Sequence, residues 1–154
     1  MCSSDLMATG TGRVSGSAVD ALREAVVAAG RRLAGRGLIA AGEGNLSVLL
    51  ADGSLLVTPS GLRKDELRAE DLLVVDPDGR ALPHPRGLRP SSDLALHRAV
   101  YAARPHVVAY AHAHLASAMA LTLAGELPDP AELPETALFL PRLPAVPLMA
   151  PGSE

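Results

Sequence analysis

Two histidines separated by one residue are the clearest chemical feature of the sequence. His112 and His114 stand in Ala111-His112-Ala113-His114, directly after the apolar run 107–110. In a β-strand, residues two apart point to the same face, so a strand here would project both imidazoles together. Neighbouring imidazoles suit the first two ligand positions of a divalent cation such as Zn²⁺. The pair therefore predicts a metal site that takes its further ligands from elsewhere.

A serine pair lies upstream of the histidines. Ser91 and Ser92 precede Asp93 and an amphipathic helical pattern that ends before Arg104-Pro105. The start of a helix offers free backbone N–H groups and the positive end of the helix dipole, which suit a phosphate. Asp93 is the nearest upstream candidate for a third metal ligand. Together these features favour a sugar-phosphate enzyme.

The segments around these residues alternate between helical and strand patterns. Glycines in 42–45 free the backbone for a loop that could cradle a ligand. Asp52-Gly53 is the signal for a hairpin with a two-residue turn. The predicted helices are 17–35, 92–103 and 114–123, and the predicted strands are 46–51, 54–58, 72–76 and 107–114.

Composition limits the possible functions. The chain has 154 residues, 48% of them hydrophobic, and a net charge of -3, so one domain with a sizeable core is expected and no general affinity for nucleic acid. A lone cysteine, Cys2, excludes a disulfide framework and favours the cytoplasm. Two histidines near the middle of the apolar stretch 107–125 argue against a membrane span.

The N-terminal segment differs from the rest. Residues 1–16 are rich in Ser, Gly and Thr and lack the apolar stretch of a signal peptide. We expect them to be a disordered or non-native leader, with the folded domain spanning 17–154.

Several short motifs occur in a characteristic order. They are Gly44-Asn45-Leu46-Ser47, Thr58-Pro59-Ser60-Gly61, Pro90-Ser91-Ser92-Asp93, then His97, Tyr101 and Arg104-Pro105, and finally His112-Ala113-His114. This series resembles the class II aldolase/adducin family, which includes L-fuculose-phosphate aldolase and L-ribulose-5-phosphate 4-epimerase.

The resemblance implies a fold and an assembly. The expected fold is an α/β, class II aldolase-like three-layer domain whose mainly antiparallel central sheet is flanked by helices, and the expected assembly is a homotetramer. Members of this family bind zinc through three histidines, the third in a His-Gly motif farther along the chain. No histidine follows His114 in this sequence. We therefore expect the domain to be incomplete at its C-terminus.

The resemblance also assigns roles to individual residues. It implies that His112 and His114 hold Zn²⁺ or another divalent metal and that Asp93 is catalytic. Aldolases of the family carry glutamate at the position of Asp93, whereas the 4-epimerase carries aspartate. The residues that fall where the family binds the substrate phosphate are Asn45, Ser60, Gly61, Ser91 and Ser92.

The implied activity is that of a zinc-dependent phospho-sugar aldolase, a lyase that cleaves a ketose phosphate through a metal-stabilised enediolate. Two alternatives stay open. One is a sugar-phosphate 4-epimerase or related dehydratase of the same family, and the other is a non-catalytic, adducin-like interaction domain. The absent third histidine leaves the activity of this 154-residue chain open.

Overall fold

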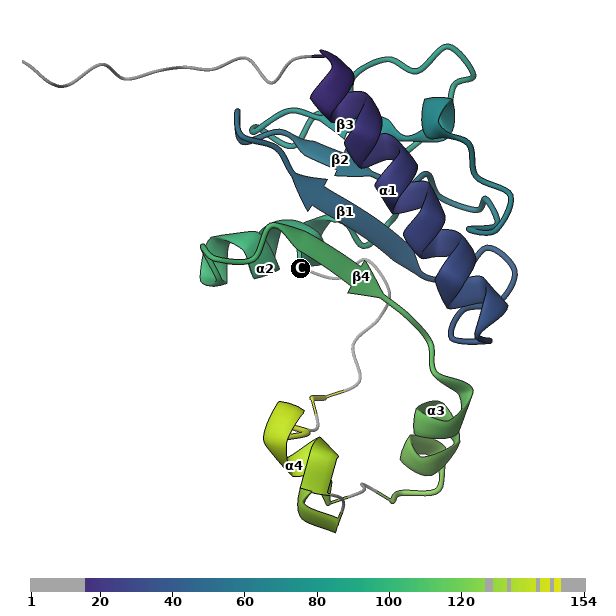
Figure 1. Cartoon of the computed structure of the whole chain (residues 1–154), viewed down its shortest axis with the longest axis vertical. Helices are drawn as coiled ribbons and strands as arrows, with labels where there is room; N and C mark the ends of the chain where they lie inside the picture. Colours follow the sequence, from purple (N-terminus) through teal and green to yellow (C-terminus); the bar gives the residue numbers. More distant parts are fainter. Residues whose placement is uncertain (1–15, 127–128, 133, 141, 145, 148–154) are drawn as a thin grey trace, which may run out of the picture.

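A four-stranded antiparallel sheet forms the centre of the fold (Figure 1). The computed structural model describes residues 16–126, 129–132, 134–140, 142–144 and 146–147. The strands are β1 (Asn45–Leu49), β2 (Leu55–Val57), β3 (Leu73–Val75) and β4 (Ala109–His112), in spatial order β3-β2-β1-β4. Strands β1 to β3 pair with their neighbours in sequence, whereas β4 joins the free side of β1 after the chain has passed through α2 (Leu94–Ala103).

Helices cover both faces of the sheet, which confirms the predicted three-layer α/β class. Helix α1 (Gly16–Gly35) lies across one face (Figure 1), where its Val27 packs in a core with Leu56 of β2. On the opposite face, Tyr101 of α2 packs in a second core with Val57. Successive strand residues point to opposite faces, so adjacent residues of β2 supply the two cores. A 3₁₀ turn, η1 (Ala69–Asp71), precedes β3.

The hairpin between β1 and β2 differs from the expected two-residue turn. The Leu50 N–H donates to the Ser54 carbonyl oxygen at 2.8 Å, and the Gly53 N–H donates to the Leu50 carbonyl oxygen at 3.0 Å. The connection is therefore the three-residue loop 51–53. Gly53, the last residue of the loop, has a φ of +83°, a left-handed conformation that favours glycine.

The C-terminal helices lie apart from the sheet (Figure 1). They are α3 (Ala116–Leu123) and α4 (Pro134–Phe139), the latter preceded by the 3₁₀ turn η2 (Pro130–Glu132). No residue of α3 or α4 is buried, and Leu123 and Phe139 are 87% and 81% exposed. Within the described ranges, no helix is long and apolar enough to cross a membrane.

The predicted leader lies almost entirely outside the described residues. Residues 1–15 are not described, and α1 already begins at Gly16, one residue before the predicted domain boundary.

Candidate functional site

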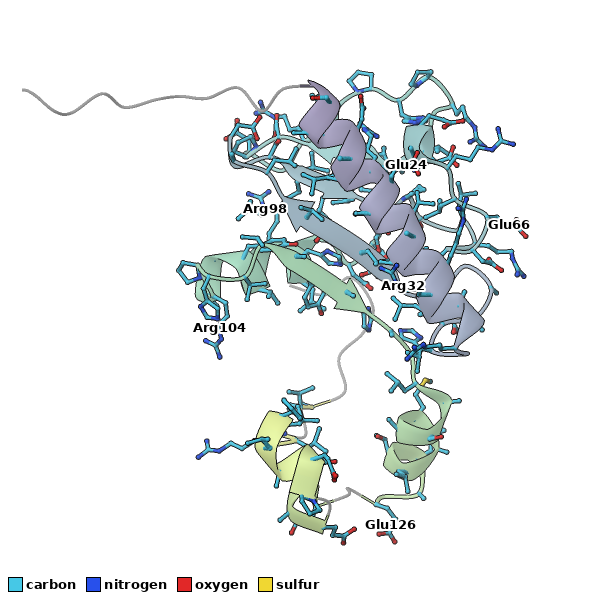
Figure 2. All side chains as sticks on the ribbon, in the orientation of Figure 1. Glu24, Arg32, Glu66, Arg98, Arg104 and Glu126 are labelled. Atoms are coloured by element: carbon cyan, nitrogen blue, oxygen red, sulfur yellow. The ribbon has the colours of Figure 1, made fainter. Side chains whose placement is uncertain are left out.

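A pocket of about 410 Å³ brings together all the residues to which the sequence assigned a metal-binding, catalytic or phosphate-binding role. It lies where the loop before β1, the turn after β2, the turn before α2 and the end of β4 meet. The predicted residues that line it are Asn45, Ser60, Gly61, Ser91, Ser92, Asp93, His112 and His114. The charged side chains labelled in Figure 2, such as Arg98 and Glu66, belong to the periphery, and none of them lines this pocket.

Two glycine-containing loops touch to form one wall of the pocket. A Cβ added to Gly42 would lie 3.0 Å from the carbonyl oxygen of Gly61, so the two backbones approach more closely than larger residues allow. The loop before β1 and the turn after β2 are therefore fixed against each other. Both loops contribute residues to the pocket lining, among them Gly42, Ser60 and Gly61.

The two histidines reach the pocket, although only one is in the strand. Strand β4 ends at His112, and His114 lies two residues beyond it, which corrects the expectation of a strand through both. Their ring centroids are nevertheless 4.8 Å apart, with the ring planes at 64°. Strand pairing places His112 directly opposite Asn45 of β1. The imidazoles therefore lie side by side as the sequence predicted.

Asp93 holds one of these imidazoles. Its Oδ2 lies 2.9 Å from Nδ1 of His112 and 2.6 Å from Nδ2 of Asn45. A carboxylate accepts, so Nδ1 of His112 carries the proton and Nε2 keeps its lone pair. Burial raises the pKa of Asp93, but the hydrogen bonds from Asn45 and His112 outweigh it and hold that pKa below its usual value. Asp93 is therefore an anion at neutral pH.

A buried hydrogen-bond network fixes the orientation of the Asn45 side chain. His97 Nε2 lies 2.5 Å from Oδ1 of Asn45, and His97 Nδ1 lies 2.6 Å from the Ser47 hydroxyl. With Asn45 donating to Asp93, its Oδ1 accepts from His97, and His97 in turn accepts from Ser47. The Tyr101 hydroxyl lies 2.7 Å from that of Ser47 and closes the network. The donor and acceptor ends of Asn45 and His97 are therefore assigned.

His97, which stands four residues after Asp93 in the sequence, is a buried residue that supports the site. It is 1% exposed, and burial lowers its pKa to about 4. Its neutral ring supports Asn45 and does not line the pocket. The network thus links the α2 helix to the candidate metal ligand through hydrogen bonds of 2.5 to 2.9 Å.

The serine turn presents its hydroxyl groups to the pocket beside the start of α2. The Asp93 N–H donates to the Ser91 hydroxyl at 3.2 Å, and Leu94 N–H donates to the Ser91 carbonyl oxygen. Ser92 lies 3.5 Å from the other Asp93 oxygen, Oδ1. Asp93 occupies the N-cap position but makes no side-chain cap hydrogen bond. Its carboxylate is therefore directed to the pocket residues and not to its own helix.

Two lining residues were not singled out from the sequence. Glu43 places its Oε1 4.0 Å from Nδ1 of His114, so each histidine has a carboxylate near the same ring nitrogen. Lys64 lines the pocket although it is only 1% exposed. Lys64 had a signal that could have found it, because it is the only lysine in the chain.

The donor set suits a divalent metal but supplies few protein ligands. Imidazole nitrogens are usual ligands of Zn²⁺, and a carboxylate behind a ligating histidine is the usual second contact. Among the described residues, no group of three or more His, Cys, Asp or Glu could hold a metal ion. His112 and His114 would therefore provide two positions of a four-coordinate shell.

Comparison with known proteins gives a family match and several relatives. A sequence profile of the family described as Class II Aldolase and Adducin N-terminal domain matches residues 24–154. A methylthioribulose-1-phosphate dehydratase from Methylococcus capsulatus is 40% identical over 89 residues, which are 58% of this chain and 42% of the relative. A 3-oxo-tetronate 4-phosphate decarboxylase from Haemophilus influenzae is 36% identical over 137 residues, which are 86% of this chain and 64% of the relative.

A solved structure extends the likeness to the fold. YgbL from Escherichia coli, described by the alternatives aldolase, epimerase and decarboxylase, matches with a TM-score of 0.75 at 30% identity, over 88% of this chain and 66% of that chain. The chain spans about half the length of the curated relatives it matches.

Proposed function

The chain belongs to the class II aldolase and adducin family, and from that membership we propose that it forms the catalytic pocket of a sugar-phosphate lyase. The relatives named as a dehydratase and a decarboxylase, both acting on phosphates, support the lyase class. The observation that carries the proposal is the meeting of His112, Asp93 and the Ser91-Ser92 turn in one pocket. Proton transfer and phosphate recognition then occur side by side.

The phosphate end of the pocket is built from neutral donors. Ser60, Ser91 and Ser92 offer hydroxyl groups, and glycine-containing backbone approaches without side chains in the way. Successive N–H groups and hydroxyls at a helix start bind phosphate oxygens well. These residues would hold the phosphate of the substrate and leave its carbonyl end to the histidines.

Asp93 is the proposed acid–base group. Its Oδ2 accepts from Asn45 and His112, so this oxygen is fixed in place. Its Oδ1 accepts only a long hydrogen bond, 3.5 Å from the Ser92 hydroxyl among the described residues, and is the oxygen available to exchange a proton with substrate. A carboxylate held on one side and open on the other can take a proton and return it without leaving its position.

The histidines are the proposed metal ligands. A divalent metal bound by His112 and His114 would polarise the substrate carbonyl as a Lewis acid. Asp93 fixes the tautomer of His112, so that Nε2 keeps the lone pair that a metal requires. The same contact sets the separation between the proton-transfer group and the metal ligand.

Two bond-breaking reactions fit this arrangement. In aldol cleavage, Asp93 Oδ1 takes the proton of the β-hydroxyl, the carbon–carbon bond breaks toward the carbonyl, and the proton returns to carbon. In dehydration, Oδ1 takes a proton from the carbon beside the carbonyl, and the next hydroxyl leaves as water with that proton. Aldol cleavage follows from the family resemblance, whereas the dehydratase relative favours dehydration.

Incubation with 5-methylthioribulose 1-phosphate and zinc tests the proposal. Mass spectrometry separates the outcomes, because dehydration gives one product lighter by a water and aldol cleavage gives two carbonyl fragments. We expect one of these product sets, and expect it to be absent from the His112→Ala chain. A metal-loaded chain that binds neither substrate nor inorganic phosphate would instead favour the non-catalytic interaction domain.

A further inference from the structure

Lys64 is an unusual residue in this chain. Of the fourteen basic residues it is the single lysine, and all the others are arginine. It is also the residue that sequence reasoning would place on the surface, within the charged run Arg63-Lys64-Asp65-Glu66. Its side chain is instead 1% exposed, the largest of the fully buried side chains.

The buried ammonium group has hydrogen bonds but no counter-ion among the residues that the structure describes. Nζ donates to the carbonyl oxygens of Gly42 at 2.9 Å and Leu62 at 2.7 Å. An ammonium has three N–H donors, and the described residues supply acceptors for two of them. No ion pair within the described ranges involves Lys64. Burying a charge without a partner is costly, so this lysine needs an explanation beyond packing.

The two hydrogen bonds alone do not require a charge. They tie the loop before β1 to the turn after β2, the same loops that touch at Gly42 and Gly61. A neutral amide could donate to both carbonyl oxygens without the cost of burying an ion. The positive charge must therefore have a role other than joining the two loops through these hydrogen bonds.

Lys64 lines the pocket together with Ser60, Gly61 and the Ser91-Ser92 turn. Its positive charge distinguishes it from the other residues of this lining. Among the described lining residues it is the one lysine or arginine, whereas Glu43 and Asp93 are acidic residues. We propose that Lys64 supplies the positive charge against which the substrate phosphate binds. The inference rests on the proposed function and adds a charged group to a phosphate site otherwise made of hydroxyls and backbone N–H groups.

Two features support this role. Burial lowers the pKa of Lys64, so a bound dianion would stabilise the protonated form and gain affinity from it. Its backbone is also held from the other side, because a Cβ on Gly30 of α1 would lie 2.9 Å from the Lys64 carbonyl oxygen. The ammonium group is thus pre-positioned, which limits the entropy lost when phosphate binds.

The single lysine makes a direct test possible in the unaltered 154-residue chain. Labelling with ¹³C,¹⁵N-lysine gives one side-chain spectrum, which belongs to Lys64. Inorganic phosphate is titrated at constant pH, with chloride at equal ionic strength as the control. We expect a saturable shift of the lysine ¹³Cε and ¹⁵Nζ resonances with phosphate and none with chloride.

Three variants separate the effect of the Lys64 charge from the effect of its hydrogen bonds to the carbonyl oxygens of Gly42 and Leu62. Lys64→Gln keeps amide donors for both carbonyl oxygens but has no charge. Lys64→Met removes both the donors and the charge, and Lys64→Arg keeps the charge. By isothermal titration calorimetry, we expect Lys64→Gln and Lys64→Met to bind inorganic phosphate about ten-fold more weakly or worse, and Lys64→Arg to retain the larger share of affinity. Should the variants not fold, the wild-type lysine resonances decide alone.

Failure of this inference differs from failure of the proposed function. The wild type could bind phosphate saturably while the Lys64 resonances stay unmoved and Lys64→Gln binds phosphate with equal affinity. That result would overturn the role of Lys64 but not the proposed phosphate binding by the serine residues. No phosphate binding at all would overturn both. The metal site stays separately measurable through zinc binding.

Discussion

The Oδ2 atom of Asp93 lies 2.9 Å from Nδ1 of His112, so a single contact joins the candidate proton-transfer group to the candidate metal ligand. The two residues come from different elements, the turn before α2 and the end of β4. Their functions are therefore expected to be coupled, and each needs its own measurement.

Replacing Asp93 by Asn should remove turnover and leave the fold intact. An amide cannot take up the substrate proton, and loss of a general acid–base group costs about 10²- to 10⁴-fold in rate. Thermal unfolding followed by circular dichroism checks the fold, and product formation checks the activity. Asp65→Asn, at an exposed carboxylate paired with Arg63, is the matched control. Undiminished turnover in Asp93→Asn would move the proton-transfer role to another residue.

Replacing His112 by Ala should weaken zinc binding by about ten-fold or more, because one of two imidazole ligands is removed. Competition with a chromogenic chelator measures the affinity. His106→Ala changes an exposed histidine outside the pocket and should leave zinc affinity unchanged. Equal zinc affinities in the two variants would argue against the metal assignment.

Stability should fall with decreasing pH because of His97. Its pKa is about 4 in the folded chain, against an ordinary value of 6.5, so between these values the unfolded chain binds a proton that the native chain does not. Stability from this group is complete above about pH 6.5 and is lost as the pH falls toward about 4, by at most about 3 kcal/mol. Urea unfolding across this window measures it.

The variant His97→Gln isolates that contribution. A glutamine can still donate to Asn45 and accept from Ser47, but it does not titrate. We expect its free energy of unfolding to vary less with pH than that of the wild type. Parallel pH profiles for the two proteins would assign the acid sensitivity to other groups.

Replacing Gly30 by Ala should destabilise the chain. The added Cβ would lie 2.9 Å from the Lys64 carbonyl oxygen, and such overpacking typically costs about 1–3 kcal/mol. Alanine's better helix propensity returns up to about 1 kcal/mol. Gly35→Ala, at a helical glycine with nothing within 4 Å, is the control. Denaturant titration of both variants should show a lower midpoint for Gly30→Ala alone.

The apolar surface of α3 and α4 should make the chain associate in solution. Leu123 and Phe139 are 87% and 81% exposed, and contiguous apolar surface promotes association. We expect Leu123→Ser with Phe139→Ser to increase solubility, measured by light scattering over a concentration series. Leu82→Ser, at a leucine 51% exposed elsewhere, should change it little. A monomeric wild-type chain at all concentrations would contradict the expectation.

The sequence predicted which segments meet at the pocket, because these segments are short and carry strong local signals. The serine pair before Asp93 and the His-Ala-His sequence were each recognisable as a candidate ligand-binding segment. The order of the motifs along the chain, through the family resemblance, indicated that these segments form one site. The structure brings these segments together in one pocket. The catalytic and binding roles, the zinc ion, the tetramer and the cytoplasmic location stay predictions.

The features that the sequence did not predict depend on contacts between distant segments. Lys64 stands in a charged run that indicates a solvated surface, yet the approach of α1 at Gly30 and the carbonyl oxygen of Gly42 bury it. Similarly, the orientation of Asn45 depends on His97, more than fifty positions along the chain. Such contacts between distant segments leave no pattern in the local sequence from which they could be predicted.

The position of β4 in the sheet has one more consequence. Within the described part of the chain, β4 pairs with β1 on one side and with no strand on the other. A strand edge of this kind can accept main-chain hydrogen bonds from another segment. Any segment added there would run alongside His112, so self-assembly and metal occupancy should be thermodynamically linked, each strengthening or weakening the other.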